Sequence, residues 1–211
     1  KALEEQQNYT KKLKFLDESE ENINLIFNDN YDLDSESYRI SLKVPHREEL
    51  LSLKIWKPEI NLKKDLIIFM PGIGGDIDHF KWLGSGLSKK GWPVIFIEHK
   101  GSDSVALNSS IKGDEALPGS ADIYLYRIKD LDFVINAYKK GQLGFKDSSS
   151  YILMGHSLGA LISMLYEGNL PSNQFLSRCE NALEDFALTN LSKLLQCQLS
   201  EIPIPEFEKS K

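Results

Sequence analysis

The segment 151–166 restricts the fold more than any other, because one short apolar run leads almost directly into a second, longer one. Residues 151–154 are Tyr-Ile-Leu-Met, which is typical of a buried strand, and residues 158–166 have the length of a helix. The connection is Gly-His-Ser-Leu-Gly, with glycines at 155 and 159 that let a strand and a helix pass close together. The pattern predicts a sharp strand–turn–helix unit with Ser157 exposed at a strained apex.

This arrangement is the G-x-S-x-G pattern of a nucleophilic serine. The bare pattern is common by chance, and such a serine is usually an ordinary loop residue, so the apolar strand and helix around it carry the interpretation. Ser157 is therefore the candidate catalytic nucleophile. The backbone N–H of Leu158, which begins the helix, is the candidate first donor to an oxyanion, since unpaired amides and the helix dipole favour negative charge there.

A glycine-rich loop is placed to supply the second oxyanion donor. Residues 66–70 form a continuous apolar run, and Pro-Gly-Ile-Gly-Gly follows at 71–75. Glycines there let the main chain approach a substrate oxygen and direct an amide at it. We expect the donor to be the N–H of Ile73, with that of Gly74 as the alternative.

The same loop has some features of a dinucleotide-binding site, because Gly72 and Gly74 follow a strand and Glu98 ends the next one. The third glycine position is Ile77, however, which would obstruct close packing of helix on strand. The chain has no Gly-Lys-Ser/Thr sequence for a phosphate loop, and no cluster of residues with metal-ligand spacing. The nucleotide-dependent enzyme is therefore the weakest alternative, and we expect no cofactor and no metal.

The histidines are in unexpected places for serine catalysis, in which the acid and the histidine normally follow the serine. The chain has four, at 46, 79, 99 and 156, and none follows Ser157. The only later aspartate is Asp185, and the chain begins with Lys. We expect a fragment whose acid and histidine lie beyond residue 211. A natural pseudoenzyme and an unusual triad with an upstream histidine are the alternatives.

Individual histidines have lesser roles in this interpretation. His99 follows a strand at the edge where ligands bind in parallel sheets, and His79 begins the helix after the glycine loop. Both are candidate pocket residues, although structural or surface roles are the default. His156 is expected to pack rather than act as a base, and His46 to lie on the surface.

The remaining pattern predicts an α/β domain. Alternation over 38–44 and 51–55 indicates a β-hairpin, and apolar runs at 66–70 and 93–97 indicate buried parallel strands. Helices are expected over 78–90 and 122–140, and a loop over 102–119. Residues 1–30 are interpreted as a charged arm with some helical character, and 31–211 as the domain, in which 168–205 forms helices that cap the site.

The composition of the chain limits the classes of partner and the cellular compartment that we expect. The chain has 211 residues, is 41% hydrophobic and has a net charge of −6, which gives no support for nucleic-acid binding. No apolar run has the length of a membrane span. Cys179 and Cys197 have no partner motif nearby, so we expect thiols in a reducing compartment and a cytoplasmic location.

Four motifs occur together in order: residues 69–75, 98–103, 127–134 and 155–160. As a set they resemble the α/β-hydrolase proteins called predicted dienelactone hydrolases, which are similar to platelet-activating-factor acetylhydrolases. The resemblance covers about residues 38–205 and implies a mostly parallel sheet with an N-terminal hairpin, incomplete at the C-terminus. It implies a serine esterase acting on a small-molecule ester, lactone or thioester. The only functional residues that the resemblance implies in this sequence are Ser157, Leu158 and the loop 72–74. A non-catalytic α/β-hydrolase-like binding module remains the main alternative.

Overall fold

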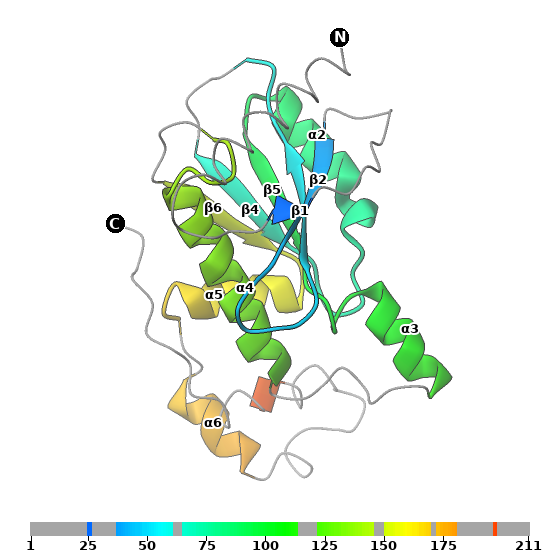
Figure 1. Cartoon of the computed structure of the whole chain (residues 1–211). Coiled ribbons are helices and arrows are strands. Elements are labelled where there is room, and N and C mark those ends of the chain that lie inside the picture. Colours follow the sequence, from blue (N-terminus) through cyan, green and yellow to red (C-terminus); the bar gives the residue numbers. More distant parts are fainter. Residues whose placement is uncertain are drawn as a thin grey trace.

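A mixed six-stranded sheet, in the order β1-β2-β3-β5-β4-β6, forms the centre of the chain (Figure 1). The structure, a computed structural model, describes residues 25–26, 37–60, 65–113, 122–145, 150–169, 172–180 and 196–197. Its strands are β1 (Leu25–Ile26), β2 (Ser37–Leu42), β3 (Leu51–Trp56), β4 (Leu66–Met70), β5 (Val94–Glu98) and β6 (Tyr151–Gly155). Its helices are η1 (Ile77–Phe80), a 3-10 helix, and α2 (Lys81–Lys89), α3 (Ser104–Lys112), α4 (Asp122–Lys139), α5 (Leu158–Tyr166) and α6 (Asn173–Cys179).

The half of the sheet that holds the serine turn is parallel. β4 lies between β5 and β6 and pairs in parallel with both, so that Phe69 lies beside Phe96 on one side and Met154 on the other. All five residues of β4 are buried, as expected for a strand covered on both faces. The α/β class, with helices connecting parallel strands, is therefore confirmed.

The other half of the sheet is antiparallel. β2 and β3 form the expected hairpin, with Tyr38 opposite Ile55 and Leu42 opposite Leu51. β3 then pairs antiparallel with β5. This position makes β3 an interior strand, and all six of its residues are buried, including Lys54, whose Nζ donates to Asp78 at 2.6 Å. The hairpin thus becomes part of the main sheet and brings its connecting turn to the edge where β5 ends.

Two hydrophobic cores lie on opposite faces of the sheet. The larger core packs α4 and α5 against the sheet, with fully buried residues such as Leu53, Ile68 and Leu131. The smaller core lies beneath α2 and includes three aromatic residues; the ring centroids of Trp56 and Phe69 each lie 4.6 Å from that of Phe96. Figure 1 shows α4 and α5 on one side of the sheet and α2 on the other. Helices on both faces explain the continuous apolar runs of the central strands.

One predicted loop is in part a helix. The segment 102–119 was expected to be a loop, but its first half is the helix α3. The Asp103 side chain caps this helix by accepting the Ala106 N–H at 3.0 Å, and Gly113 ends it in the left-handed conformation. The helix has no buried residue and stands away from the sheet in Figure 1, so it lacks the apolar periodicity that identified the other helices.

The terminal segments are only partly described. Within the arm predicted for 1–30, residues 25–26 are the strand β1, paired antiparallel with β2, rather than helix. The rest of the arm lies outside the described residues. Of the predicted cap, α6 is described together with residues 196–197, and the remainder also lies outside the description. The domain boundaries therefore stay predictions.

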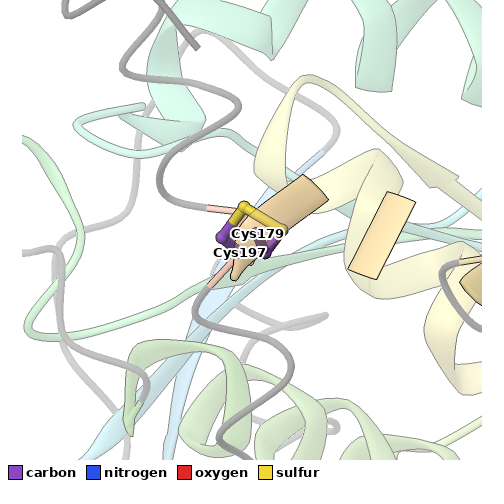
Figure 2. The surroundings of a disulfide bond; sticks show 2 residues. All are labelled: Cys179 and Cys197. Carbon is purple, nitrogen blue, oxygen red and sulfur yellow. A yellow bond between two sulfur atoms is a disulfide. The ribbon is translucent and has the colours of Figure 1, made fainter. Parts of the chain in front are cut away.

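The two cysteines were expected to be thiols, but they form a disulfide (Figure 2). The bond joins Cys179, the last residue of α6, to Cys197, with 5.3 Å between the Cα atoms. The expectation failed because a separation of 18 residues carries no pairing signal until the fold brings the two together. Disulfides persist mainly in oxidising compartments, so this bond weighs against the expected cytoplasmic location. Among the described helices, none is long and apolar enough to cross a membrane.

We expect a thiol-reactive dye to modify neither cysteine in the unfolded but unreduced chain, and both after a reductant is added. Replacing both cysteines with serine should lower the free energy of unfolding by up to about 3 kcal/mol, because a closed loop of this length restricts the unfolded chain. Denaturant titration of the parent and of the double variant measures this difference. Reaction of both cysteines without reductant would contradict the disulfide.

Candidate functional site

Ser157 lies at the turn between β6 and α5, in a conformation that side chains rarely adopt. Its φ of 52° is the only positive value at a non-glycine residue in the described part of the chain, and its ψ is −118°. These angles are those of the first central position of a type II′ turn, which favours glycine. The residue is exposed, and its Oγ has no hydrogen-bond partner among the described residues. The strain and the exposure match the apex predicted from the sequence.

The two glycines around Ser157 are required by close backbone contacts. A Cβ on Gly155 would lie 2.2 Å from the carbonyl carbon of Gly159, and a Cβ on Gly159 would lie 2.0 Å from the Met70 carbonyl oxygen. The His156 N–H also donates to the Met70 oxygen, at 3.0 Å. The turn is therefore packed directly on the end of β4, and no side chain fits between the two.

The glycine loop after β4 lies against this turn. A Cβ on Gly72 would lie 3.0 Å from the Ser157 Cβ and 3.3 Å from the His156 Nδ1. The Gly74 N–H donates to the Ser102 carbonyl at 2.9 Å, and the Gly75 N–H donates to the Gly72 carbonyl at 3.2 Å. The loop and the serine therefore come together, as predicted, and the Gly74 amide is already occupied by a carbonyl of the protein.

Two backbone amides next to the serine remain available to a ligand. The Ile73 N–H donates to no acceptor within the described residues, and its side chain packs on the larger core. Leu158 is the first residue of α5, and amides in the first turn of a helix have no acceptor within that helix. Of the two alternatives in the glycine loop, Ile73 is thus better suited than Gly74 to donate to a substrate.

All four histidines of the chain are described, and none bonds to Ser157. The ring of His156 lies 5.6 Å from that of Phe80, and His79 is an exposed residue of η1. His99 was a candidate pocket residue, but the structure buries it completely. His99 belongs to the turn after β5, and its side chain reaches Asp130 of α4.

His99 and His46 instead bind one buried carboxylate. The Asp130 carboxylate accepts hydrogen bonds from His99 Nδ1 at 2.8 Å, from His46 Nε2 at 2.7 Å and from Arg47 Nη2 at 2.7 Å. His46 is therefore not the surface residue that its place in the hairpin turn suggested. Burial lowers the pKa of His99 to about 4, and the charge of Arg127 acts in the same direction against Asp130. His99 is thus neutral near pH 7, with a proton on Nδ1.

The carboxylate of Asp130 stays ionised despite its burial. Burial alone would raise its pKa, but the hydrogen bonds from His46 and His99 and the charge of Arg47 hold that pKa below its usual value. This cluster ties the hairpin turn, α4 and the turn after β5 together. His46 and His99 both bind this carboxylate, and neither forms a hydrogen bond with Ser157.

Sequence reasoning missed a buried arginine behind the glycine loop. Arg127 of α4 is 1% exposed, and its guanidinium donates to the carbonyls of Pro71, Gly72 and Ser102 and to the Ser102 hydroxyl. It lies on the buried, mostly apolar face of α4, three residues after Tyr124 and four before Leu131. A charged residue on such a face was the available signal, since buried arginines are rare unless paired.

A cavity of about 1040 Å³ lies beside this region and not at the serine. Its walls come from the hairpin turn, the turn after β5 and α4, and they include Lys43, Arg47, Lys100 and Tyr126. Neither Ser157 nor the candidate pocket residues His79 and His99 line it. Within the described residues, no group of side chains could hold a metal ion.

The elbow glycines give a sharp stability prediction. Gly159→Ala should lower the free energy of unfolding by about 3 kcal/mol or more, because the new Cβ would meet the Met70 carbonyl. Gly86→Ala is the matched control, since Gly86 lies in α2 and a Cβ there meets nothing within 4 Å. It should be neutral or stabilising by up to about 1 kcal/mol. If urea titrations showed the same change in the free energy of unfolding for Gly159→Ala and Gly86→Ala, the close contact between Gly159 and the Met70 carbonyl would be excluded.

The strain at Ser157 can be measured separately. Ser157→Gly and Ser157→Ala both remove the hydroxyl, but only glycine adopts the positive φ without cost. We expect the glycine variant to be the more stable of the two by about 1 kcal/mol, after allowing for the greater entropy of glycine in the unfolded chain. Denaturant titrations of both variants check this order, and a more stable alanine variant would contradict the strain.

Comparison with known proteins gives distant structural likeness only. No family model and no curated protein sequence matches the chain. Among solved structures, a thermostable carboxyl esterase from Bacillus coagulans has a TM-score of 0.46 at 14% identity, over 82% of this chain and 60% of its own. Acetyl xylan esterase 1 from Thermoanaerobacterium sp. JW/SL YS485 has a TM-score of 0.46 at 13% identity, over 94% and 72%. A probable hydrolytic enzyme from Pseudomonas aeruginosa PAO1 has a TM-score of 0.38 at 14% identity, over 82% and 61%.

The chain thus spans 60% of the length of the carboxyl esterase. The geometry of the chain itself identifies its architecture. A serine at positive φ joins β6 to the helix packed on it, and the sheet continues from its parallel half into an antiparallel hairpin. The chain therefore has an α/β-hydrolase-like fold.

Proposed function

We propose that this chain carries the nucleophile and the oxyanion donors of a serine hydrolase that cleaves carboxylic esters, lactones or thioesters of small molecules. The observation that carries the proposal is the conformation of Ser157. A strained, exposed serine whose Oγ has no partner among the described residues, at the N-terminus of a helix, has no evident structural use. It does suit a nucleophile.

The proposed reaction begins with attack of Ser157 Oγ on the carbonyl carbon of the substrate. The serine proton passes to a base, and the carbonyl oxygen becomes an oxyanion that accepts hydrogen bonds from the N–H groups of Ile73 and Leu158. Collapse of this intermediate expels the alcohol or thiol, which takes up the proton, and leaves an acyl-enzyme that water hydrolyses. Each oxyanion donor is typically worth on the order of 3 kcal/mol in the transition state.

The general base is assigned to a residue other than the four histidines described above. His46 and His99 are held by Asp130, and His79 and His156 form no hydrogen bond with Ser157. The proposal therefore places the acid and the histidine outside this chain, and it predicts slow acylation of Ser157 unless a base is supplied. Loss of a triad base reduces the rate by several orders of magnitude.

The lack of a hydrogen bond between Ser157 and any of the four histidines favours a second candidate, a non-catalytic α/β-hydrolase-like binding module. In that case the elbow is kept only as a structural turn, and Ser157 has no reactivity above that of an ordinary serine. The two candidates differ in one property, which is whether the oxyanion donors accelerate reaction at this serine.

Fluorophosphonate labelling followed by intact-mass measurement tests the difference, with imidazole added to replace the missing base. We expect a single adduct on the parent chain, formed faster as imidazole is raised, and none on Ser157→Ala. Ser172→Ala is the matched control, because Ser172 is also an exposed serine just before a helix, and it should label like the parent.

The unfolded chain in urea completes the design, since it retains Ser157 but loses the elbow. Its labelling should fall to the rate of free serine. A folded parent that fails to label at any imidazole concentration would exclude the hydrolase proposal and support the binding module. Labelling at Ser157 without imidazole would show that a base is present within this chain.

A further inference from the structure

The guanidinium of Arg127 binds backbone carbonyls of the proposed oxyanion loop. Nη1 donates to the Pro71 carbonyl at 2.5 Å, and Nη2 donates to the Gly72 carbonyl at 3.0 Å. On the other side, Nη2 donates to the Ser102 carbonyl at 3.2 Å and Nε to the Ser102 Oγ at 2.8 Å. One buried side chain thus joins the loop after β4 to the turn after β5.

Ser102 completes the connection between these two segments. Its carbonyl accepts both the Gly74 N–H, at 2.9 Å, and the guanidinium of Arg127. The loop is therefore bound on both sides of Ile73, at Gly72 through its carbonyl and at Gly74 through its amide. Ile73 itself is the residue between them whose amide has no acceptor in the described chain.

The contact at Gly72 acts directly on that amide, because the Gly72 carbonyl and the Ile73 N–H belong to one planar peptide group. In a trans peptide the two bonds point in opposite directions, so fixing the carbonyl on Arg127 fixes the direction of the N–H. A cation at the oxygen also withdraws electron density from the peptide and makes its N–H a stronger donor.

We propose that Arg127 is a positioning residue of the oxyanion hole, which orients and polarises the Gly72–Ile73 peptide so that its N–H points at the substrate oxygen beside Ser157. This inference rests on the proposed function and assigns a role to a residue that touches neither substrate nor serine. Burial lowers the pKa of Arg127 to about 9, with Asp130 and Asp103 opposing, so the side chain stays cationic near pH 7.

The geometry also explains why this residue is arginine. A planar fork of donors reaches Pro71 and Gly72 on one edge while its Nε reaches Ser102, which a single ammonium group cannot do. Lysine at this position keeps the charge and loses the fork. Arg127→Lys is therefore the variant that separates orientation from charge.

The test uses the whole chain and the imidazole-assisted fluorophosphonate reaction at Ser157. Arg127→Lys should label on the order of tenfold or more slowly than the parent, since a misdirected oxyanion donor loses part of its effect on the transition state. The matched control is Arg47→Lys. Arg47 is a buried arginine of the same charge cluster, and it binds Asp130 and the Lys100 carbonyl without touching residues 71–74. This control should label within about twofold of the parent, even where its melting temperature falls.

A second variant keeps the test decisive if Arg127→Lys does not fold. Ser102→Ala removes only the hydroxyl that accepts from Nε and should slow labelling in the same direction by a smaller factor. Parental labelling rates in a folded Arg127→Lys would overturn the proposal. If that variant is unfolded, a parental rate in Ser102→Ala would overturn it.

An amide readout separates this inference from the proposed function. The ¹⁵N and ¹H shifts of the Ile73 amide should move in Arg127→Lys and Ser102→Ala and stay unchanged in Arg47→Lys. If the parent never labels, the hydrolase proposal fails, and the Ile73 amide alone decides the orienting role of Arg127. Unchanged chemical shifts of the Ile73 amide in a folded Arg127→Lys variant would then overturn the orienting role. If only Ser102→Ala folds, unchanged shifts in that variant would overturn it.

Discussion

The contact between the serine turn and the end of β4 is the constraint on which the rest of the site depends. Gly159 lies so close to the Met70 carbonyl that no Cβ can be accommodated, and the His156 N–H donates to the same oxygen. This contact holds α5 on the sheet, sets the positive φ of Ser157 and brings the serine beside Gly72. The strain at the serine is therefore maintained by the tight packing of backbone on backbone.

Buried charged groups join the elements that surround the site. Asp130 binds the hairpin turn through His46 and Arg47, and the turn after β5 through His99. Arg127, on the same helix, binds the glycine loop. Charges removed from water are costly unless they are paired and hydrogen-bonded, and both Asp130 and Arg127 have such partners. The helix α4 thus joins the antiparallel hairpin to the loop beside the serine, although none of its residues touches the substrate in the proposed reaction.

Much of the fold could be predicted because local pattern and tertiary environment agree. The runs at 66–70 and 151–154 are strands, and 122–140 and 158–166 are helices within one or two residues. The failures have two causes, which are helix signals without apolar periodicity and contacts between residues that are distant in sequence. α3 is an exposed helix determined by its caps at Asp103 and Gly113, and the disulfide joins cysteines whose spacing has no motif. His46, in a polar turn, is drawn inward by an aspartate 84 residues away.

The sequence by itself determined the strand–serine–helix unit, since two glycines around a serine between apolar runs permit few other structures. It also indicated the glycine loop, because glycine is the residue that lets backbone approach backbone. Only the tertiary structure decided how these parts act together. In the folded chain the Gly74 N–H donates to the Ser102 carbonyl, and His99 is buried against Asp130. The guanidinium of Arg127 binds the carbonyl of the Gly72–Ile73 peptide. Hydrogen-bond direction and burial depend on groups from several elements meeting at one point, and no single segment of sequence contains that information.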